Sequence, residues 1–163
     1  MSAASPRGLA PATLLLCHHG TRGAAAAADL AVAIALPGLT TVVHCLVVPD
    51  LWGGMQGDDW LNDATTRDAF GAYVEKMLAE EARAVSRAIE AQCHARGVDY
   101  RAALRFGEPA AVALAVAAEV GADLCVIGPP RRRGEAGLRS RMRLERLLRD
   151  LPCPLLVASR RSR

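Results

Sequence analysis

The hydrophobic positions along the chain fall into short continuous runs separated by longer amphipathic stretches. Residues 13–17, 40–48 and 123–128 are almost wholly apolar, and a further run at 153–158 follows a proline. Runs of this length and composition are typical of strands that are buried on both faces. In residues 100–106 one face carries Tyr100, Ala102, Leu104 and Phe106, and the other carries Arg101 and Arg105. This alternation predicts a half-exposed strand at the edge of a sheet.

The stretches between these runs have helical spacing. Residues 24–36 are rich in alanine and end at a Pro-Gly pair, and residues 65–97 repeat apolar positions every three or four residues. Both patterns predict helices with one apolar face. A further helix is expected after residue 107, because Pro109 suits a first turn and Gly121 suits the position just past the end.

One more helix is expected near the C-terminus. Residues 129–139 contain prolines, glycines and arginines, which indicates a loop, and Pro152 ends the apolar spacing that follows it. Ser140 is the predicted N-cap, since a serine hydroxyl can accept from a free backbone N–H of the first turn. The leucines expected to point inward are Leu144, Leu147, Leu148 and Leu151.

The regular alternation of strands and helices predicts an α/β fold, a doubly wound five-stranded parallel sheet with helices on both faces. We expect a single domain over residues 12–159, a flexible tail at 1–11 and a basic tail at 160–163. Ligands bind such sheets beyond the carboxyl ends of the strands, where the strand order reverses. Two segments follow such ends, CHHGT at 17–21 and GPPRRR at 128–133, and both are candidate binding segments.

The charge is unevenly spread along the 163 residues. Residues 1–128 carry nine Lys and Arg against fourteen Asp and Glu, whereas residues 129–163 carry eleven Arg against three acids. The basic quarter predicts an electropositive surface that suits an anionic partner, with a plain solvated loop as the alternative. Weak nucleic-acid association is a further alternative, but nucleic-acid binding is not favoured because the chain has only two Phe and two Tyr to stack on bases.

The cysteines indicate a reducing compartment. The five form no C-x-x-C pair, and most lie inside apolar runs, so they are expected to be reduced and buried in a cytoplasmic protein without membrane insertion. A signal peptide is disfavoured because Pro11 and two histidines interrupt the first apolar run. The cysteines are Cys17, Cys45, Cys93, Cys125 and Cys153.

The histidines near the first strand raise the question of a metal. Cys17 and His19 would point to one side of a strand and His18 to the other. His44 could join them only if the two strands pair and its side chain shares their face. A metal centre needs about three or four converging ligands, so no metal is expected. The chain also lacks a G-x-S-x-G segment, and no catalytic residues or enzymatic activity are expected.

Three short motifs resemble the universal stress protein family over roughly residues 12–159. They are Gly-Glu-Pro at 107–109, the segment from Gly-Ala-Asp to the final glycine at 121–128, and Pro-Cys-Pro at 152–154. The resemblance implies a Rossmann-like sheet of the adenine nucleotide alpha hydrolase-like type and a homodimer joined through the last strand. It also implies a cytoplasmic regulatory or adaptor role in the stress response, and no established catalytic reaction.

Some members of that family bind ATP through a Gly-x2-Gly-x9-Gly-Ser/Thr motif. Without gaps, its four positions fall here on Gly128, Arg131, Arg141 and Met142, so only the first is kept. ATP-binding members also carry an acid just after the first strand, where this chain has His19. Backbone that approaches phosphate closely favours residues without a Cβ. The resemblance therefore implies a member that does not bind ATP in the usual mode.

The alternative is a nucleotide- or anion-binding sensor that uses the Arg-rich segment 129–143 and the turn at 18–21. A helix N-terminus near Ser140 would favour an anion. The alternative for the segment at 18–21 is a tight turn that needs Gly20, in which His19 caps or packs. No cofactor is firmly expected, and ATP or another nucleotide is the candidate ligand. The candidate binding residues are His18, His19, Gly20, Thr21, Gly128, Arg131, Gly137, Ser140 and Arg141.

Overall fold

The computed structural model describes residues 10–18, 22–48, 64–130 and 142–159. Both predicted tails, apart from residues 10 and 11, and most of the tryptophan-containing stretch at 49–64 lie outside the described residues. Among the described residues, no helix combines the length and the apolar character needed to cross a membrane.

Five parallel strands form one sheet in the order β3-β2-β1-β4-β5, which confirms the predicted class of fold. The two central strands are nearly free of polar residues, as expected for strands covered on both faces. The short β5 and the longer β3 form the two edges. The strands are β1 (Thr13–His18), β2 (Thr41–Val48), β3 (Asp99–Phe106), β4 (Leu124–Ile127) and β5 (Leu155–Val157).

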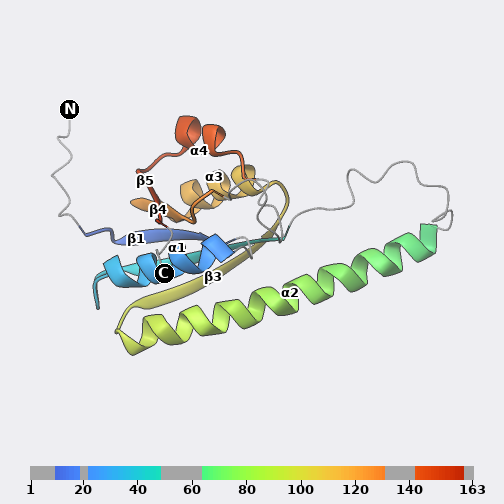
Figure 1. Cartoon of the computed structure of the whole chain (residues 1–163), viewed down its shortest axis with the longest axis horizontal. Helices are drawn as coiled ribbons and strands as arrows, with labels where there is room; N and C mark the ends of the chain where they lie inside the picture. Colours follow the sequence, from blue (N-terminus) through green and yellow to red (C-terminus); the bar gives the residue numbers. More distant parts are fainter. Residues whose placement is uncertain (1–9, 19–21, 49–63, 131–141, 160–163) are drawn as a thin grey trace.

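Helices cover both faces of the sheet (Figure 1). Helices α1 and α2 contribute to the core on one face, and α3 and α4 contribute to the core on the other. The alternation of side chains along the strands supplies both cores, since Leu14 and Leu16 face α1 and α2 while Leu15 and Cys17 face α3 and α4. The helices are α1 (Arg22–Ile34), α2 (Ala64–Ala95), α3 (Pro109–Val120) and α4 (Leu144–Asp150).

Helix α3 begins and ends as the sequence predicts. Pro109 is its first residue, and the backbone N–H of Gly121 closes its last turn from a left-handed conformation with φ of 60°. Glycine adopts that conformation without the steric cost that a Cβ imposes.

The edge strand β3 agrees with its alternating pattern only in part. Arg101 and Arg105 are exposed as expected, but Ala102 and Phe106, which the pattern places on the buried face, are exposed too, and Phe106 is 54% exposed. Charged side chains on an edge strand oppose pairing with another chain.

The C-terminal part of helix α2 packs on the sheet. Ile89 and Cys93 are buried against the sheet, whereas Tyr73 and Met77 are 60% and 53% exposed. The apolar spacing of the helix therefore meets the core of the sheet in its C-terminal part, and the other end of the helix runs on past the sheet (Figure 1).

Helix α4 corrects two expectations. It begins at Leu144 with Arg143 as N-cap and no side-chain cap, so the prediction that Ser140 caps this helix is wrong. The prediction that Leu148 points inward is also wrong, because it is 66% exposed while Leu147 is fully buried. Successive helical residues point about 100° apart, and a helix of two turns presents only one narrow stripe to the core.

Candidate functional site

The strand order reverses between β1 and β4, which are hydrogen-bonded neighbours in the middle of the sheet. Their carboxyl ends, at His18 and Ile127, lie beside the start of α1 at Arg22. Open α/β sheets bind ligands at this point. We therefore take the carboxyl ends of β1 and β4, together with the first turn of α1, as the candidate site.

Gly128 belongs to this site and is in close contact with α1. A Cβ on Gly128 would lie 2.5 Å from the carbonyl oxygen of Gly23 and 3.0 Å from the backbone nitrogen of Ala24. Such approaches leave no room for a side chain. Gly128 therefore lets β4 end against the first turn of α1, a packing role that holds whether or not a ligand binds.

His18 forms the rim of the site and is almost completely buried. Its ring packs edge to face on His44 of the neighbouring strand, with 5.4 Å between the ring centroids. Burial lowers the pKa of His18 to about 4. Burial, followed by repulsion from His18, lowers the pKa of His44 to about 3. Both imidazoles are therefore neutral at pH 7, and His18 presents no positive charge to a ligand phosphate.

A row of hydrogen bonds continues from His44 to helix α2. Nδ1 of His44 lies 2.8 Å from the Tyr100 hydroxyl, which lies 2.6 Å from the Ser86 hydroxyl. Burial raises the pKa of Tyr100, so the phenol keeps its proton. Among the described residues, Nε2 of His44 has no hydrogen-bond partner, and it is fully buried. The row spans β2, β3 and α2 behind the site.

A carboxylate of the protein already occupies the N-terminus of α3, at the same end of the sheet. The Glu108 carboxylate accepts hydrogen bonds of 3.0 and 2.9 Å from the backbone N–H groups of Ala110 and Ala111. Arg146 of α4 donates to the same carboxylate at 2.9 Å. Burial opposes ionisation of Glu108, but these donors outweigh it and hold its pKa below the usual value.

The structure describes only two residues of the predicted binding set, and their binding roles stay predictions. His18 and Gly128 lie at the site as described above, and Met142 packs against the core that α3 and α4 cover. The remaining candidates lie outside the described residues, and their roles stay predictions. They are His19, Gly20, Thr21, Arg131, Gly137, Ser140 and Arg141.

His44, which the sequence left as a conditional partner for a metal, lies next to His18. The side chains of His18 and His44 share the face toward α1 and α2, whereas Cys17 faces the other core. Among the described residues, no group of three or more His, Cys, Asp or Glu side chains is arranged to hold a metal ion. The row through Tyr100 and Ser86 was not predicted, although a histidine inside an apolar strand is a signal of a buried polar partner.

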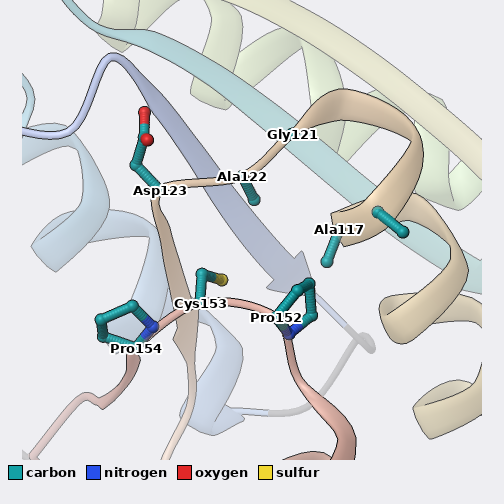
Figure 2. Close-up of a pocket in the computed structure, with 8 residues that line it drawn as sticks. Ala117, Gly121, Ala122, Asp123, Pro152, Cys153 and Pro154 are labelled. Carbon is teal, nitrogen blue, oxygen red and sulfur yellow. The ribbon is translucent and has the colours of Figure 1, made fainter. Parts of the chain in front are cut away.

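A hollow of about 380 Å³ lies at the opposite end of the sheet. The end of α3, Asp123 and the Pro-Cys-Pro segment at 152–154 line it (Figure 2). Asp123 is held there by backbone donors, since its carboxylate accepts from the N–H groups of Ala12 and Thr13 at 3.1 and 2.9 Å. The hollow is therefore separate from the candidate site at the carboxyl ends.

Comparison with known proteins agrees with this architecture. Among solved structures, a universal stress family protein from Burkholderia pseudomallei is 26% identical, with a TM-score of 0.65, covering 90% of this chain and 94% of that one. Universal stress protein UspA from Lactobacillus plantarum is 17% identical, with a TM-score of 0.72, covering 90% and 97%. A family member from Arabidopsis thaliana with AMP bound is 15% identical, with a TM-score of 0.58, covering 93% and 94%.

No curated protein sequence matches the chain. The model of the universal stress protein family matches residues 12–159, which is nearly the whole chain. The strand order, the capped helix after Gly107 and the aspartate that holds the start of β1 all lie within that match. The chain belongs to the universal stress protein family.

Proposed function

We propose that this chain is a regulatory or adaptor protein of the stress response that has no enzymatic activity and does not hold ATP in the family's usual mode. The observation that carries the proposal is the placement of Met142. The family motif has Ser or Thr at this position, whereas here an apolar side chain packs against the core between the sheet, α3 and α4. The chain therefore has no hydroxyl at this position to bind a phosphate, and the side chain that replaces it contributes to the hydrophobic core.

Two further features support the loss of the family's usual mode of ATP binding. The retained glycine of the motif, Gly128, is required by its contact with Gly23, so its presence is no sign of a phosphate cradle. The N-terminal amides of α3, which could attract an anion at this end of the sheet, already bind the carboxylate of Glu108.

The proposal also covers the oligomeric state and the cellular location of the protein. We infer a homodimer through β5 and a cytoplasmic location, both of which the family resemblance implies. Val157 on β5 and Leu148 on α4 are 40% and 66% exposed, as apolar residues at a subunit interface would be in one isolated chain. The other edge, β3, carries Arg101 and Arg105, which supports β5 as the edge that pairs.

A nucleotide- or anion-binding sensor is the second candidate. The Arabidopsis member with AMP bound supports it, because that protein shares the fold. The eleven arginines of residues 129–163 would suit the phosphate. In this case the ligand would be held by side chains rather than by a glycine-rich backbone.

Thermal unfolding with added nucleotide separates the two candidates. A ligand that binds only the folded chain at a hundred times its Kd adds about 2.7 kcal/mol of stability. Millimolar ATP or AMP should leave the unfolding temperature unchanged under the first proposal. A saturable rise with AMP or ATP would favour the sensor, and inorganic phosphate as a control would show whether the anion alone suffices.

A further inference from the structure

Strand β3 forms the long edge of the sheet and is open along one side. All eight of its residues pair with β2, and among the described residues no strand lies on its other side. Only Ala103 of this strand is buried. The opposite edge, β5, has three residues. An edge strand as long as β3 presents a row of backbone N–H and C=O groups to another chain.

The helices cover only part of this strand. Near its start, Tyr100 is partly buried, and its hydroxyl lies 2.6 Å from the Ser86 hydroxyl of α2. Farther along the same face, Ala102 and Phe106 are exposed, and helix α2 runs away from this end of the strand (Figure 1). The carboxyl half of β3 thus keeps apolar surface whose burial by a further chain would be favourable.

The other face of β3 carries charges. Asp99, Arg101 and Arg105 are exposed and share the face of Ala103, because side chains alternate along a strand. Arg105 donates to Glu119 of α3 at 3.2 Å. In the part of the chain that the structure describes, neither Asp99 nor Arg101 has an ion-pair partner. A strand added beside β3 would therefore meet an open acid and an open base two residues apart.

These charges oppose pairing with a second copy of β3. In an antiparallel pair centred on Ala103, Arg101 of each copy would lie opposite Arg105 of the other. Like charges directly opposite each other are destabilising. A strand with the complementary charges avoids this cost, so the same side chains that reject one partner select another. The occupant that fits is a strand of different sequence.

We propose that the edge of β3 is the docking strand for an extended segment of a partner protein, which adds antiparallel to the sheet. The segment alternates apolar residues on the Phe106 face with polar residues on the other. On that polar face an acidic residue lies opposite Arg101 and a basic residue lies opposite Asp99. This inference rests on the proposed adaptor role, because it names the kind of partner that the adaptor binds.

The physical basis is that of strand addition. Main-chain hydrogen bonds along the open edge supply the affinity, and the alternate side chains supply the specificity. Opposite charges that face each other on neighbouring strands stabilise the pair. Asp99 and Arg101 carry opposite charges, so they also fix the register, because a partner shifted along the strand would lose both matches.

The probe is a fluorescent peptide with one residue for each of the eight residues of β3. Valine occupies the positions on the Phe106 face, and threonine occupies the others, apart from glutamate opposite Arg101 and lysine opposite Asp99. Fluorescence anisotropy with the full chain measures the Kd. We expect saturable binding of one peptide per chain. A peptide with the glutamate and lysine exchanged should bind at least about fivefold more weakly.

A charge exchange in the protein provides a matched control. Asp99→Arg and Arg101→Asp, made together, keep the net charge and should reverse the preference between the two peptides. Arg149→Asp and Asp150→Arg, made together on the exposed pair of α4, should leave it unchanged. Circular dichroism checks that both variants are folded.

Two further measurements separate the contributions of backbone and side chains. A peptide that is N-methylated on the amides facing β3 keeps its side chains but cannot form the main-chain hydrogen bonds, and it should not bind. Phe106→Ala, which removes a side chain that is 54% exposed, should weaken the binding of both charged peptides.

The proposal is overturned if neither peptide binds, if the two bind with equal Kd, or if the methylated peptide binds as well as its parent. A change in the molecular mass of the chain on exchange of Asp99 and Arg101, without peptide, would assign the edge to a second copy. Titration with ATP separates these outcomes from failure of the proposed function. Absence of peptide binding in a chain that also binds no ATP removes only the docking strand, whereas ATP binding in the usual mode contradicts the proposed function whatever the peptides do.

Discussion

The Tyr100 hydroxyl lies 2.8 Å from Nδ1 of His44 and 2.6 Å from the Ser86 hydroxyl, and so joins the centre of the sheet to helix α2. Removing the hydroxyl leaves a fully buried ring nitrogen without its partner. An unsatisfied buried polar group costs about 1–3 kcal/mol. We expect Tyr100→Phe to lower the free energy of unfolding by that amount in a urea titration.

Tyr73→Phe is the matched control, because Tyr73 lies in the N-terminal part of α2 and is 60% exposed. It should change the free energy of unfolding by less than about 0.5 kcal/mol. If the two substitutions lowered the free energy of unfolding equally, the hydrogen bonds through Tyr100 would contribute no particular stability.

The buried histidines predict a loss of stability in acid. The pKa values of His18 and His44 are about 4 and about 3 in the folded chain, below the ordinary value of 6.5. Below pH 6.5 the unfolded chain binds protons that the folded chain cannot. Each histidine then lowers the free energy of unfolding by about 1.4 kcal/mol per pH unit, until the pH reaches its folded pKa.

Replacing one of these histidines should reduce that dependence. His44→Leu is expected to unfold with a slope against pH about half as steep as that of the natural sequence between about pH 5.5 and pH 4.5. His94→Gln, at an exposed position on α2, should leave the slope unchanged. Identical slopes in the natural sequence and His44→Leu would contradict the assignment of neutral, buried imidazoles.

The glycine contact at the candidate site predicts an order of stabilities. Gly128→Ala places a Cβ 2.5 Å from the carbonyl oxygen of Gly23, so the start of α1 must shift. Overpacking of this kind costs about 1–3 kcal/mol. Gly23→Ala meets its nearest atom, the carbonyl oxygen of Pro129, at 3.0 Å, and alanine also favours a helix by about 1 kcal/mol.

Gly128→Ala should therefore have the lower unfolding temperature of the two, measured without any nucleotide. The reverse order would show that Gly128 is not needed for packing against α1, and would restore its interpretation as a residue kept for a ligand.

The exposed apolar residues near β5 predict the mode of assembly. Val157→Glu, at a position 40% exposed in the single chain, should convert the proposed homodimer into monomers in light scattering. A charge buried without a partner at an interface is strongly unfavourable. Phe106→Glu, on the opposite edge and 54% exposed, should leave the mass unchanged. A dimer broken only by Phe106→Glu would place the interface at β3.

The sequence predicted the fold because its apolar runs and helical spacing follow the five strands and four helices of the structure. It could not predict where α4 begins, since a helix of two turns held by Leu147 needs no side-chain cap. It also could not predict the contact between His18 and His44. That contact depends on the register of β1 against β2, which local patterns do not determine.

The central claim is that the natural chain does not hold ATP in the family's usual mode. Calorimetric titration with ATP and Mg²⁺ tests it most directly, beside a variant that carries His19→Asp, Arg131→Gly, Arg141→Gly and Met142→Ser together to rebuild the motif. The account predicts no saturable heat for the natural sequence at millimolar ATP, and binding by the rebuilt variant once its folding is confirmed. Saturable, stoichiometric binding of ATP by the natural sequence, with the same Kd as the rebuilt variant, would contradict it.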